Sequence, residues 1–160
     1  MEDSLLKSVV NLLEERRLTI AIAESMTGGL LSQYLTSIDG SSRYFMGSIV
    51  AYSYFAKEKV LGVPHHLIED FGAISKEVAE ALAQNAAELL NTDIGVGITG
   101  NAGPDAQEGK PVGLVYVGLY YKGNTKVLEK FLSGSRSEIR EQTVDFALNI
   151  ILESLKEDHI

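Results

Sequence analysis

Three short segments of this sequence contain residue types that could carry out chemistry, and each follows an apolar run. The first is AESMTGG, in which Ser25 and Thr27 precede two glycines, Gly28 and Gly29. A serine hydroxyl becomes a nucleophile when a base takes its proton. Glycines at the start of a helix let backbone N–H groups approach an anion or an oxyanion. The simpler interpretation is that Ser25 or Thr27 only caps the helix, and spacing alone leaves both interpretations open.

A base for such a serine is not expected among the histidines. His65 and His66 are adjacent and lie beside a proline, and His159 is the second residue from the end. None of them fits the pattern of a serine–histidine triad, so we interpret all three as solvated loop or tail residues. Their spacing does not indicate a zinc site either, because no matching pair of ligands follows.

The second segment, AYSYFAKEK, offers a lysine as the base. A lysine acts as a base only when it is neutral, and both partial burial and a position near the start of a helix favour the neutral form. Lys57 is suitably placed, and Tyr52, five residues earlier, could pass a proton or orient the pair. Spacing separates Lys57 only weakly from Lys59, and the plain alternative for either is a solvated surface lysine.

The third segment, GITGNAGP, is rich in glycine but lacks the spacing of a nucleotide fingerprint or of a P-loop. Its amides and the Thr99 hydroxyl could line a polar ligand, and the alternative is a tight crossing between a strand and a loop. The candidate ligand-binding residues of this segment are Thr99, Gly100, Asn101, Ala102 and Gly103.

Two arginines, Arg136 and Arg140, are four residues apart near the start of the last expected helix. Cations are unfavourable at a helix N-terminus, so a compensating gain is expected, for which an anionic ligand such as a phosphate is one candidate. Pairing with Glu138, Glu141 or another carboxylate is the alternative.

The elements that must position these residues follow from hydrophobic periodicity and turn residues. Strands are expected at 18–24, 41–53 (with Gly47 as a possible bulge) and 93–100, and a hairpin of 112–121 and 125–133 turns at Gly123–Asn124. Helices are expected at 3–17, 28–38, 53–61, 75–91 and 135–157, with one further helical turn within 65–72. This alternation predicts an α/β protein, a three-layer α/β/α sandwich with a mixed, mostly parallel sheet. If the first three strands are parallel neighbours, the three segments with chemically active residues meet at one edge of the sheet.

Composition narrows the class of protein. The 160 residues suit one domain, 1–160, and 45% apolar residues are ordinary for a globular protein. A net charge of −8 disfavours nucleic acid as a partner. There are no cysteines, which is compatible with a cytoplasmic protein, and neither a signal peptide nor a membrane span is expected. We expect a homo-oligomer, because small α/β enzymes often assemble in this way.

Taken together, the segments resemble the CinA C-terminal domain family, which includes stand-alone nicotinamide-mononucleotide amidases. The stretches that carry the resemblance, in order, are TIAIAESMTGGLLSQYLT, SIVAYSYFAKEKVLGV, FGAISKEVAEALA, GVGITGNAGP, KPVGLVYVGL and SRSEIREQTVDFAL. They cover nearly all of the chain, and the combination is more specific than any single stretch.

The resemblance implies a serine amidohydrolase with Ser25 as nucleophile, Lys57 as general base and Tyr52 as its helper. It selects Lys57 over Lys59, and it assigns the TGG amides to the oxyanion or ligand and the TGNAGP loop to the substrate pocket. The implied reaction converts nicotinamide mononucleotide, through an acyl-enzyme, into nicotinic acid mononucleotide and ammonia. It implies no metal and no cofactor, and its partner is a small-molecule nucleotide.

Two features of the sequence bear on the substrate. Family members often have a hydrophobic residue at the position of Asn101 and glycine at that of Asp105, so the shape of the pocket differs here. A non-catalytic nucleotide-binding or regulatory module and an amidase for another small amide are the alternative functions.

Overall fold

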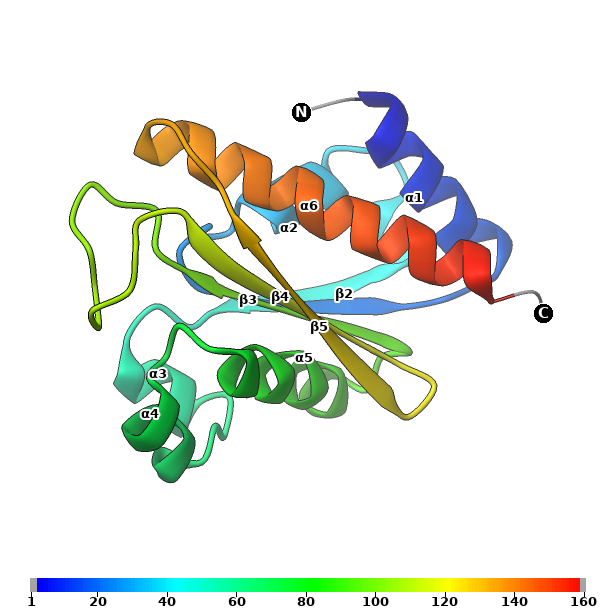
Figure 1. Ribbon diagram of the computed structural model, residues 1–160. Helices are drawn as coiled ribbons and strands as arrows, with labels where there is room; N and C mark the ends of the chain where they lie inside the picture. Colours follow the sequence, from blue (N-terminus) through cyan, green and yellow to red (C-terminus); the bar gives the residue numbers. More distant parts are fainter. Residues whose placement is uncertain (1–2, 159–160) are drawn as a thin grey trace.

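The computed structural model describes residues 3–158, and a five-stranded sheet with the order β2-β1-β3-β4-β5 forms its centre (Figure 1). The strands are β1 (Ile20–Glu24), β2 (Phe45–Val50), β3 (Ile94–Gly100), β4 (Leu114–Tyr121) and β5 (Asn124–Phe131). β1 pairs in parallel with β2 and β3, whereas β4 is antiparallel to both β3 and β5. β4 therefore runs against the other strands, and the sheet is mixed, as the hairpin pattern predicts.

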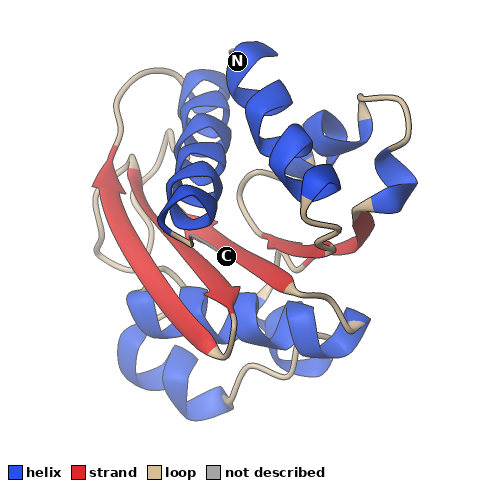
Figure 2. Cartoon of the chain, turned by 90° about the vertical axis from the view of Figure 1, so that its right-hand side faces the viewer, coloured by secondary structure: helices blue, strands red, loops and turns tan. Residues whose placement is uncertain are grey.

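Helices cover both faces of this sheet (Figures 1 and 2). One face carries α1 (Asp3–Glu15), α2 (Leu30–Thr36) and α6 (Arg136–Glu157), and the other carries α3 (Tyr54–Lys59), α4 (His65–Phe71) and α5 (Lys76–Leu90). The predicted α/β/α arrangement of three layers is confirmed. No helix within residues 3–158 combines the length and the apolar character needed to cross a membrane.

β1 shows how the core is divided between the two faces. Its side chains alternate, so that Ile20 and Ile22 pack in the cluster with α1, α2 and α6, whereas Ala21 and Ala23 pack in the cluster with α4 and α5. All five residues of β1 are buried, which explains why the run is continuously apolar up to Glu24. β1 is thus a fully buried interior strand of the sheet, and Ser25 follows it directly.

Several boundaries differ from those expected from the sequence. The predicted strand 41–53 is shorter, because Ser41–Arg43 form a turn of 3-10 helix and the chain leaves the sheet after Val50. A register shift opposite Ile20 and Ala21 places the predicted bulge at Gly47. The hairpin turn is Lys122–Gly123, one residue earlier than expected. Both residues have positive φ (53° and 79°), as a two-residue turn of type I′ requires.

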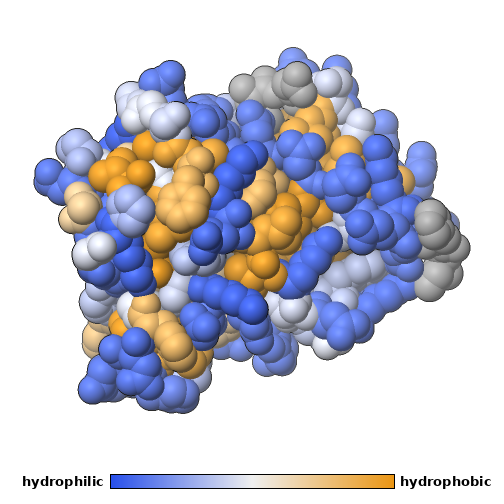
Figure 3. All heavy atoms as spheres, viewed as in Figure 1, coloured by the Kyte–Doolittle hydropathy of each residue, from blue (hydrophilic) through white to orange (hydrophobic). Residues whose placement is uncertain are grey.

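The carboxyl ends of β1, β2 and β3 lie at one edge of the sheet. Glu24 lies beside Val50, and Ala23 lies beside Gly97, so the three parallel strands end close to one another. The segments that start at Ser25, Ala51 and Asn101 therefore leave the sheet together. The edge of the sheet opposite β2 is β5. The molecular surface on this side shows apolar residues interrupted by hydrophilic ones (Figure 3). Leu128 and Phe131 of β5 are exposed.

Candidate active site

The structure brings the predicted nucleophile and the predicted base into direct contact. Ser25 Oγ and Lys57 Nζ are 2.8 Å apart, although 32 residues separate them in the sequence. Ser25 is 7% exposed and Lys57 is 2% exposed, so the pair is shielded from bulk water. The distance is that of a hydrogen bond, which is the geometry required for transfer of the serine proton to the lysine.

Local structure on the β1 side holds Ser25 in place. The buried carboxylate of Glu24 accepts hydrogen bonds from the amides of Leu31 (3.1 Å) and Ser32 (2.9 Å) and from the Ser32 hydroxyl (2.6 Å). Glu24 thereby caps the first turn of α2 and ties it to the end of β1. The amides of Leu31 and Ser32 are therefore bound within the protein, and the contact of the TGG amides with a ligand stays a prediction.

Lys57 is positioned by the short helix that follows β2. Ser53 is the N-cap of α3, and its side chain accepts a hydrogen bond from the amide of Ala56. Lys57 is the next residue, and its Nζ lies 2.8 Å from the carbonyl oxygen of Ala51 and 3.2 Å from that of Tyr52. The side chain thus folds back from α3 over the strand end towards Ser25.

The surroundings of Lys57 favour its neutral form. No carboxylate within residues 3–158 forms an ion pair with it. Burial lowers the pKa of Lys57 from 10.5 to about 8, and the negative charge of Glu108 opposes that effect only in part. With a pKa of about 8, about one molecule in ten carries the uncharged amine at pH 7, and this fraction grows as the pH rises.

A small cavity of about 60 Å³ opens beside the nucleophile. It is lined by residues from all three strand ends and from the start of α6, namely Ser25, Met26, Tyr52, Gly100, Asn101, Ala102, Gln107 and Arg136. The expectation that the three segments meet is therefore correct. Asn101 and Ala102 are buried, and Tyr52 is 57% exposed and lies at the outer side.

The two arginines occupy different places. Arg136 lines the cavity and donates hydrogen bonds to the carbonyl oxygen of Gly103 (2.5 Å) and to the hydroxyl of Tyr52 (2.8 Å). Arg140 donates instead to the carbonyl oxygens of Met26 (3.1 Å) and Thr27 (2.8 Å). Arg140 therefore supports the loop after β1, whereas Arg136 bridges the rim of the cavity. Neither relies on the carboxylate pairing that was the alternative.

Tyr52 is expected to assist Lys57, but its hydroxyl is directed elsewhere. Its hydroxyl contacts Arg136, and it is the main-chain carbonyl of Tyr52 that contacts Lys57. Its part in proton transfer stays a prediction.

The remaining predicted ligand residues divide into lining and support. Thr99 is buried, and its hydroxyl donates to the carbonyl oxygen of Ala73 (2.8 Å), so it joins the β3 end to the start of α5. The amide of Gly28 donates to the carbonyl oxygen of Ser25 (3.0 Å). Gly28 and Gly29 have φ angles of 61° and 101°, which glycine adopts readily, and Gly29 is the residue before α2. The Thr27 hydroxyl is buried without a partner.

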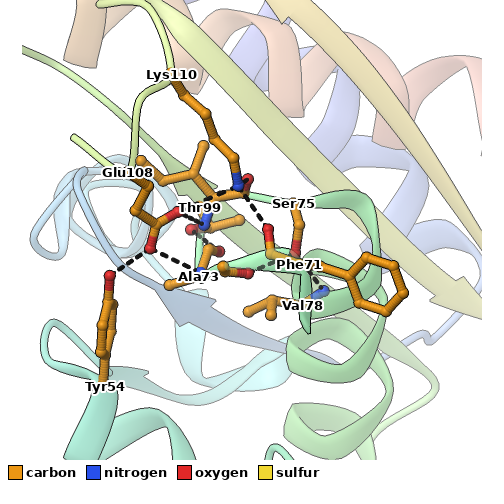
Figure 4. A network of polar contacts seen from close by, with 10 residues as sticks. Tyr54, Phe71, Ala73, Ser75, Val78, Thr99, Glu108 and Lys110 are labelled. Atoms are coloured by element: carbon orange, nitrogen blue, oxygen red, sulfur yellow. Dashed lines mark hydrogen bonds and ion pairs between the residues drawn. The ribbon is translucent and has the colours of Figure 1, made fainter. Parts of the chain in front are cut away.

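Sequence reasoning missed the network that holds the loop between β3 and β4. The Glu108 carboxylate accepts hydrogen bonds from the Tyr54 hydroxyl and from the amides of Ala73 (2.9 Å) and Ile74 (3.0 Å), and Lys110 Nζ reaches the same carboxylate and the carbonyl oxygen of Ile74 (Figure 4). Burial raises the pKa of Glu108, but these hydrogen bonds outweigh it and lower the pKa overall. The sequence offered one sign of this pair: Glu108 and Lys110 carry opposite charges and are separated by a single residue in a polar loop.

His65 forms contacts that agree with its interpretation as a surface residue. It lies at the start of α4, exposed, within 3.0 Å of Glu58 and 3.2 Å of Glu69. His66 is exposed as well. His159 lies outside the described residues.

Comparison with known proteins identifies the family of this chain. Residues 2–155 match the CinA C-terminal domain. The chain belongs to the CinA C-terminal domain family. Similar proteins include a putative competence-damage inducible protein of Bacillus pumilus (44% identical over 156 residues, 98% of this chain) and one of Moorella thermoacetica (46% over 157 residues, 97% of this chain). This CinA C-terminal domain spans 38% of the length of each of these two relatives.

Solved structures of CinA proteins share the fold of this CinA C-terminal domain. The competence damage-inducible protein A of Klebsiella pneumoniae subsp. pneumoniae superposes with a TM-score of 0.95 at 26% identity, and each chain is covered to 98%. The competence/damage inducible protein CihA of Agrobacterium tumefaciens gives a TM-score of 0.89 at 35% identity, covering 96% of this chain and 94% of that one.

Proposed function

We propose that this CinA C-terminal domain is a serine amidohydrolase that converts nicotinamide mononucleotide into nicotinic acid mononucleotide and ammonia. The observation that carries the proposal is the 2.8 Å contact between Ser25 Oγ and a buried Lys57 Nζ that has no carboxylate partner within residues 3–158. The substrate is the one implied by the resemblance of the sequence to the nicotinamide-mononucleotide amidases of this family.

The oxygens around Lys57 are compatible with a neutral amine that acts as a base. A neutral amine has two N–H donors and one lone pair, whereas a backbone carbonyl oxygen only accepts. The carbonyl oxygens of Ala51 and Tyr52 take up the two N–H groups. The lone pair of Nζ is then directed towards Ser25 Oγ and accepts its proton.

The reaction follows in two balanced steps. Ser25 Oγ attacks the carboxamide carbon while its proton passes to Lys57, and the resulting ammonium group of Lys57 protonates the departing nitrogen, which leaves as ammonia. A water molecule then attacks the acyl-enzyme and gives a proton to Lys57. That proton returns to Ser25 Oγ as the carboxylic acid is released, and the free enzyme is restored.

The cavity suits the reacting end of such a substrate. About 60 Å³ is room for a carboxamide and not for a whole nucleotide, so the ribose and the phosphate lie outside it. Arg136 stands at the rim, where its guanidinium could bind the phosphate. We propose Arg136, and not Arg140, as the phosphate ligand, because Arg136 lines the cavity beside Ser25, whereas Arg140 supports the β1–α2 loop.

The direct test is release of ammonia from nicotinamide mononucleotide by the purified protein. We expect turnover by the wild type, none by Ser25→Ala, and unchanged turnover by Ser137→Ala, an exposed serine of α6. Equal ammonia from wild type and Ser25→Ala would contradict the mechanism.

Nicotinamide and its riboside, assayed alongside, test the substrate. A preference for either over the mononucleotide would make the protein an amidase for another small amide. Calorimetric binding of the mononucleotide without any turnover would instead indicate a binding or regulatory module.

A further inference from the structure

Asn101 carries a buried hydrogen-bond donor that no protein group satisfies. Its Nδ2 has no partner, and the residue is 2% exposed and lines the cavity beside Ser25. Leaving a buried N–H group unpaired is energetically costly, so such a group in a native structure calls for an explanation. A ligand oxygen in the cavity would supply the missing acceptor.

The orientation of this side chain is determined by its neighbours. The Oδ1 atom accepts a hydrogen bond from the amide of Gly103 (3.0 Å), and an amino group in that place would face another donor. The main chain of Asn101 is held as well, with its amide bound to Leu114 (3.0 Å) and its carbonyl to Gly113 (2.7 Å). The side chain is therefore fixed before any ligand arrives, and Nδ2 is its atom without a partner within residues 3–158.

Several other donors around Ser25 are already used within the protein. The amide of Gly28 binds the Ser25 carbonyl oxygen, the first-turn amides of α2 bind Glu24, and Arg140 binds two loop carbonyls. A serine that attacks an amide needs a donor for the oxygen that becomes negatively charged. Nδ2 of Asn101 is a pre-oriented donor that meets this need.

We propose that Asn101 is a catalytic residue whose Nδ2 donates a hydrogen bond to the carbonyl oxygen of the scissile amide and stabilises the oxyanion of the tetrahedral intermediate. The inference rests on the proposed amidase function and deepens it. The ligand atom that it assigns to the cavity is a carbonyl oxygen bonded to the carbon that Ser25 attacks.

The first experiment compares Asn101→Ala and Asn101→Asp with the wild type on nicotinamide mononucleotide. Asn101→Asp keeps the acceptor for the Gly103 amide and nearly the same volume but replaces the donor by an oxygen. We expect kcat to fall by about 10²–10³-fold in both variants, with KM changed little, as for loss of one oxyanion donor. The control is Asn149→Asp, which alters an exposed asparagine of α6 and should leave kcat unchanged.

A second substrate separates this inference from the choice of nucleotide. p-Nitrophenyl acetate places only an acetyl group in the cavity; Ser25 takes the acetyl, p-nitrophenolate leaves, and Lys57 receives the serine proton. The rate of p-nitrophenolate release, corrected by Ser25→Ala, should fall in both Asn101 variants. If it falls while the mononucleotide is not hydrolysed by any form, the substrate assignment is wrong and the role of Asn101 stands.

Two results would overturn the inference. One is a folded Asn101→Asp variant, judged by an unchanged thermal unfolding transition, that acylates and turns over at the wild-type rate. The other is a rise in KM with kcat unchanged, which would make Asn101 a ground-state binding residue. A wild type that reacts with neither substrate would overturn both the inference and the proposed function.

Discussion

At the scale of single residues, the proposed chemistry depends on one amine that is buried without a countercharge. Lys57 Nζ lies 2.8 Å from Ser25 Oγ and within hydrogen-bond distance of two backbone carbonyl oxygens. Desolvation is the main cause of its lowered pKa. Lys59, two residues further along α3, is exposed and has no such surroundings.

The pH dependence of turnover should report this base. Because burial lowers the pKa of Lys57 to about 8, the neutral fraction grows as pH rises, and kcat/KM should rise with a midpoint near pH 8 and then level off. Lys57→Ala should lose about 10²–10⁴-fold in kcat, the usual contribution of a general base, whereas Lys59→Ala should keep the wild-type profile. A profile that falls across this range, or loss of activity in Lys59→Ala alone, would remove Lys57 from this role.

Arg136 should affect binding more than chemistry. If it contacts the substrate phosphate, Arg136→Ala loses one hydrogen bond to a charged group, worth about 1.5–3 kcal/mol, and KM should rise about 10–100-fold with a smaller change in kcat. Steady-state kinetics on nicotinamide mononucleotide give the two constants, with Arg43→Ala, an exposed arginine before β2, as the control. An unchanged KM would place the phosphate elsewhere.

At the scale of elements, the site is the meeting point of three strand ends, and short polar contacts connect each end to the helix beyond it. Glu24 joins β1 to α2, Ser53 starts α3, and Thr99 ties β3 to the segment before α5. The Glu108 network fastens the β3–β4 loop to that same segment and to α3. These anchors keep the nucleophile, the base and Asn101 in a fixed arrangement before substrate arrives, which is what catalysis by positioning requires.

Removing the carboxylate of Glu24 should loosen both α2 and the neighbouring nucleophile. Glu24→Ala leaves the amides of Leu31 and Ser32 without their acceptor in a buried place. We expect the free energy of unfolding to fall by at least about 1.5–3 kcal/mol, the value for hydrogen bonds to a charged group, as measured by urea denaturation. Glu15→Ala, at an exposed position at the end of α1, should change it by less than about 0.5 kcal/mol. Equal effects in the two variants would show that the cap contributes little.

At the scale of the whole molecule, close contact between α5 and the sheet sets the distance between the layers on the α3–α5 side. An added Cβ at Gly97 would lie 2.5 Å from the Ala79 carbonyl oxygen and 2.5 Å from the Ala83 amide, so the helix backbone rests on β3 itself. The same helix contacts β1 and β4 and buries Ala21 and Ala23 on the β1 strand that leads to Ser25. The position of the strand ends therefore depends on this packing.

Gly97→Ala should be costly for that reason. The methyl group meets backbone, which cannot rotate away, and such overpacking typically costs about 1–3 kcal/mol. We expect a clear fall in the thermal unfolding temperature, whereas Glu80→Ala, on the exposed side of α5, should leave it nearly unchanged. An unfolding temperature for Gly97→Ala equal to that of the wild type would show that α5 can shift away without loss.

Assembly into a homo-oligomer stays a prediction at this scale. A partner surface on the tyrosine-rich run 112–121 is not favoured, because β4 lies between β3 and β5 and most of it is buried. The β2 edge, with Met46 and Val50 exposed, and the β5 edge are the sides left open within the described chain. Sedimentation equilibrium measures the mass of the protein in solution and so distinguishes a monomer from a homo-oligomer.

The sequence by itself determined the class of fold and, through the family resemblance, pointed to the proposed reacting pair. Periodicity and strand-ending glycines predict the alternating elements, because burial on one face imposes a local pattern that can be read residue by residue. The motifs likewise pointed to Ser25 and Lys57. Boundaries set by backbone geometry were harder to predict from the sequence. The hairpin turn and the start of β2 each depend on φ angles and on a register that neighbouring strands impose.

Only the tertiary structure decided which donors remain available at the site. Whether Arg136 or Arg140 faces the cavity, and whether the α2 amides are free, depends on contacts between residues far apart in the chain. The unpaired Nδ2 of Asn101 is a property of the folded molecule in the same sense. A hydrogen bond depends on the distance between two atoms in space, and the local sequence pattern does not determine that distance for residues far apart in the chain.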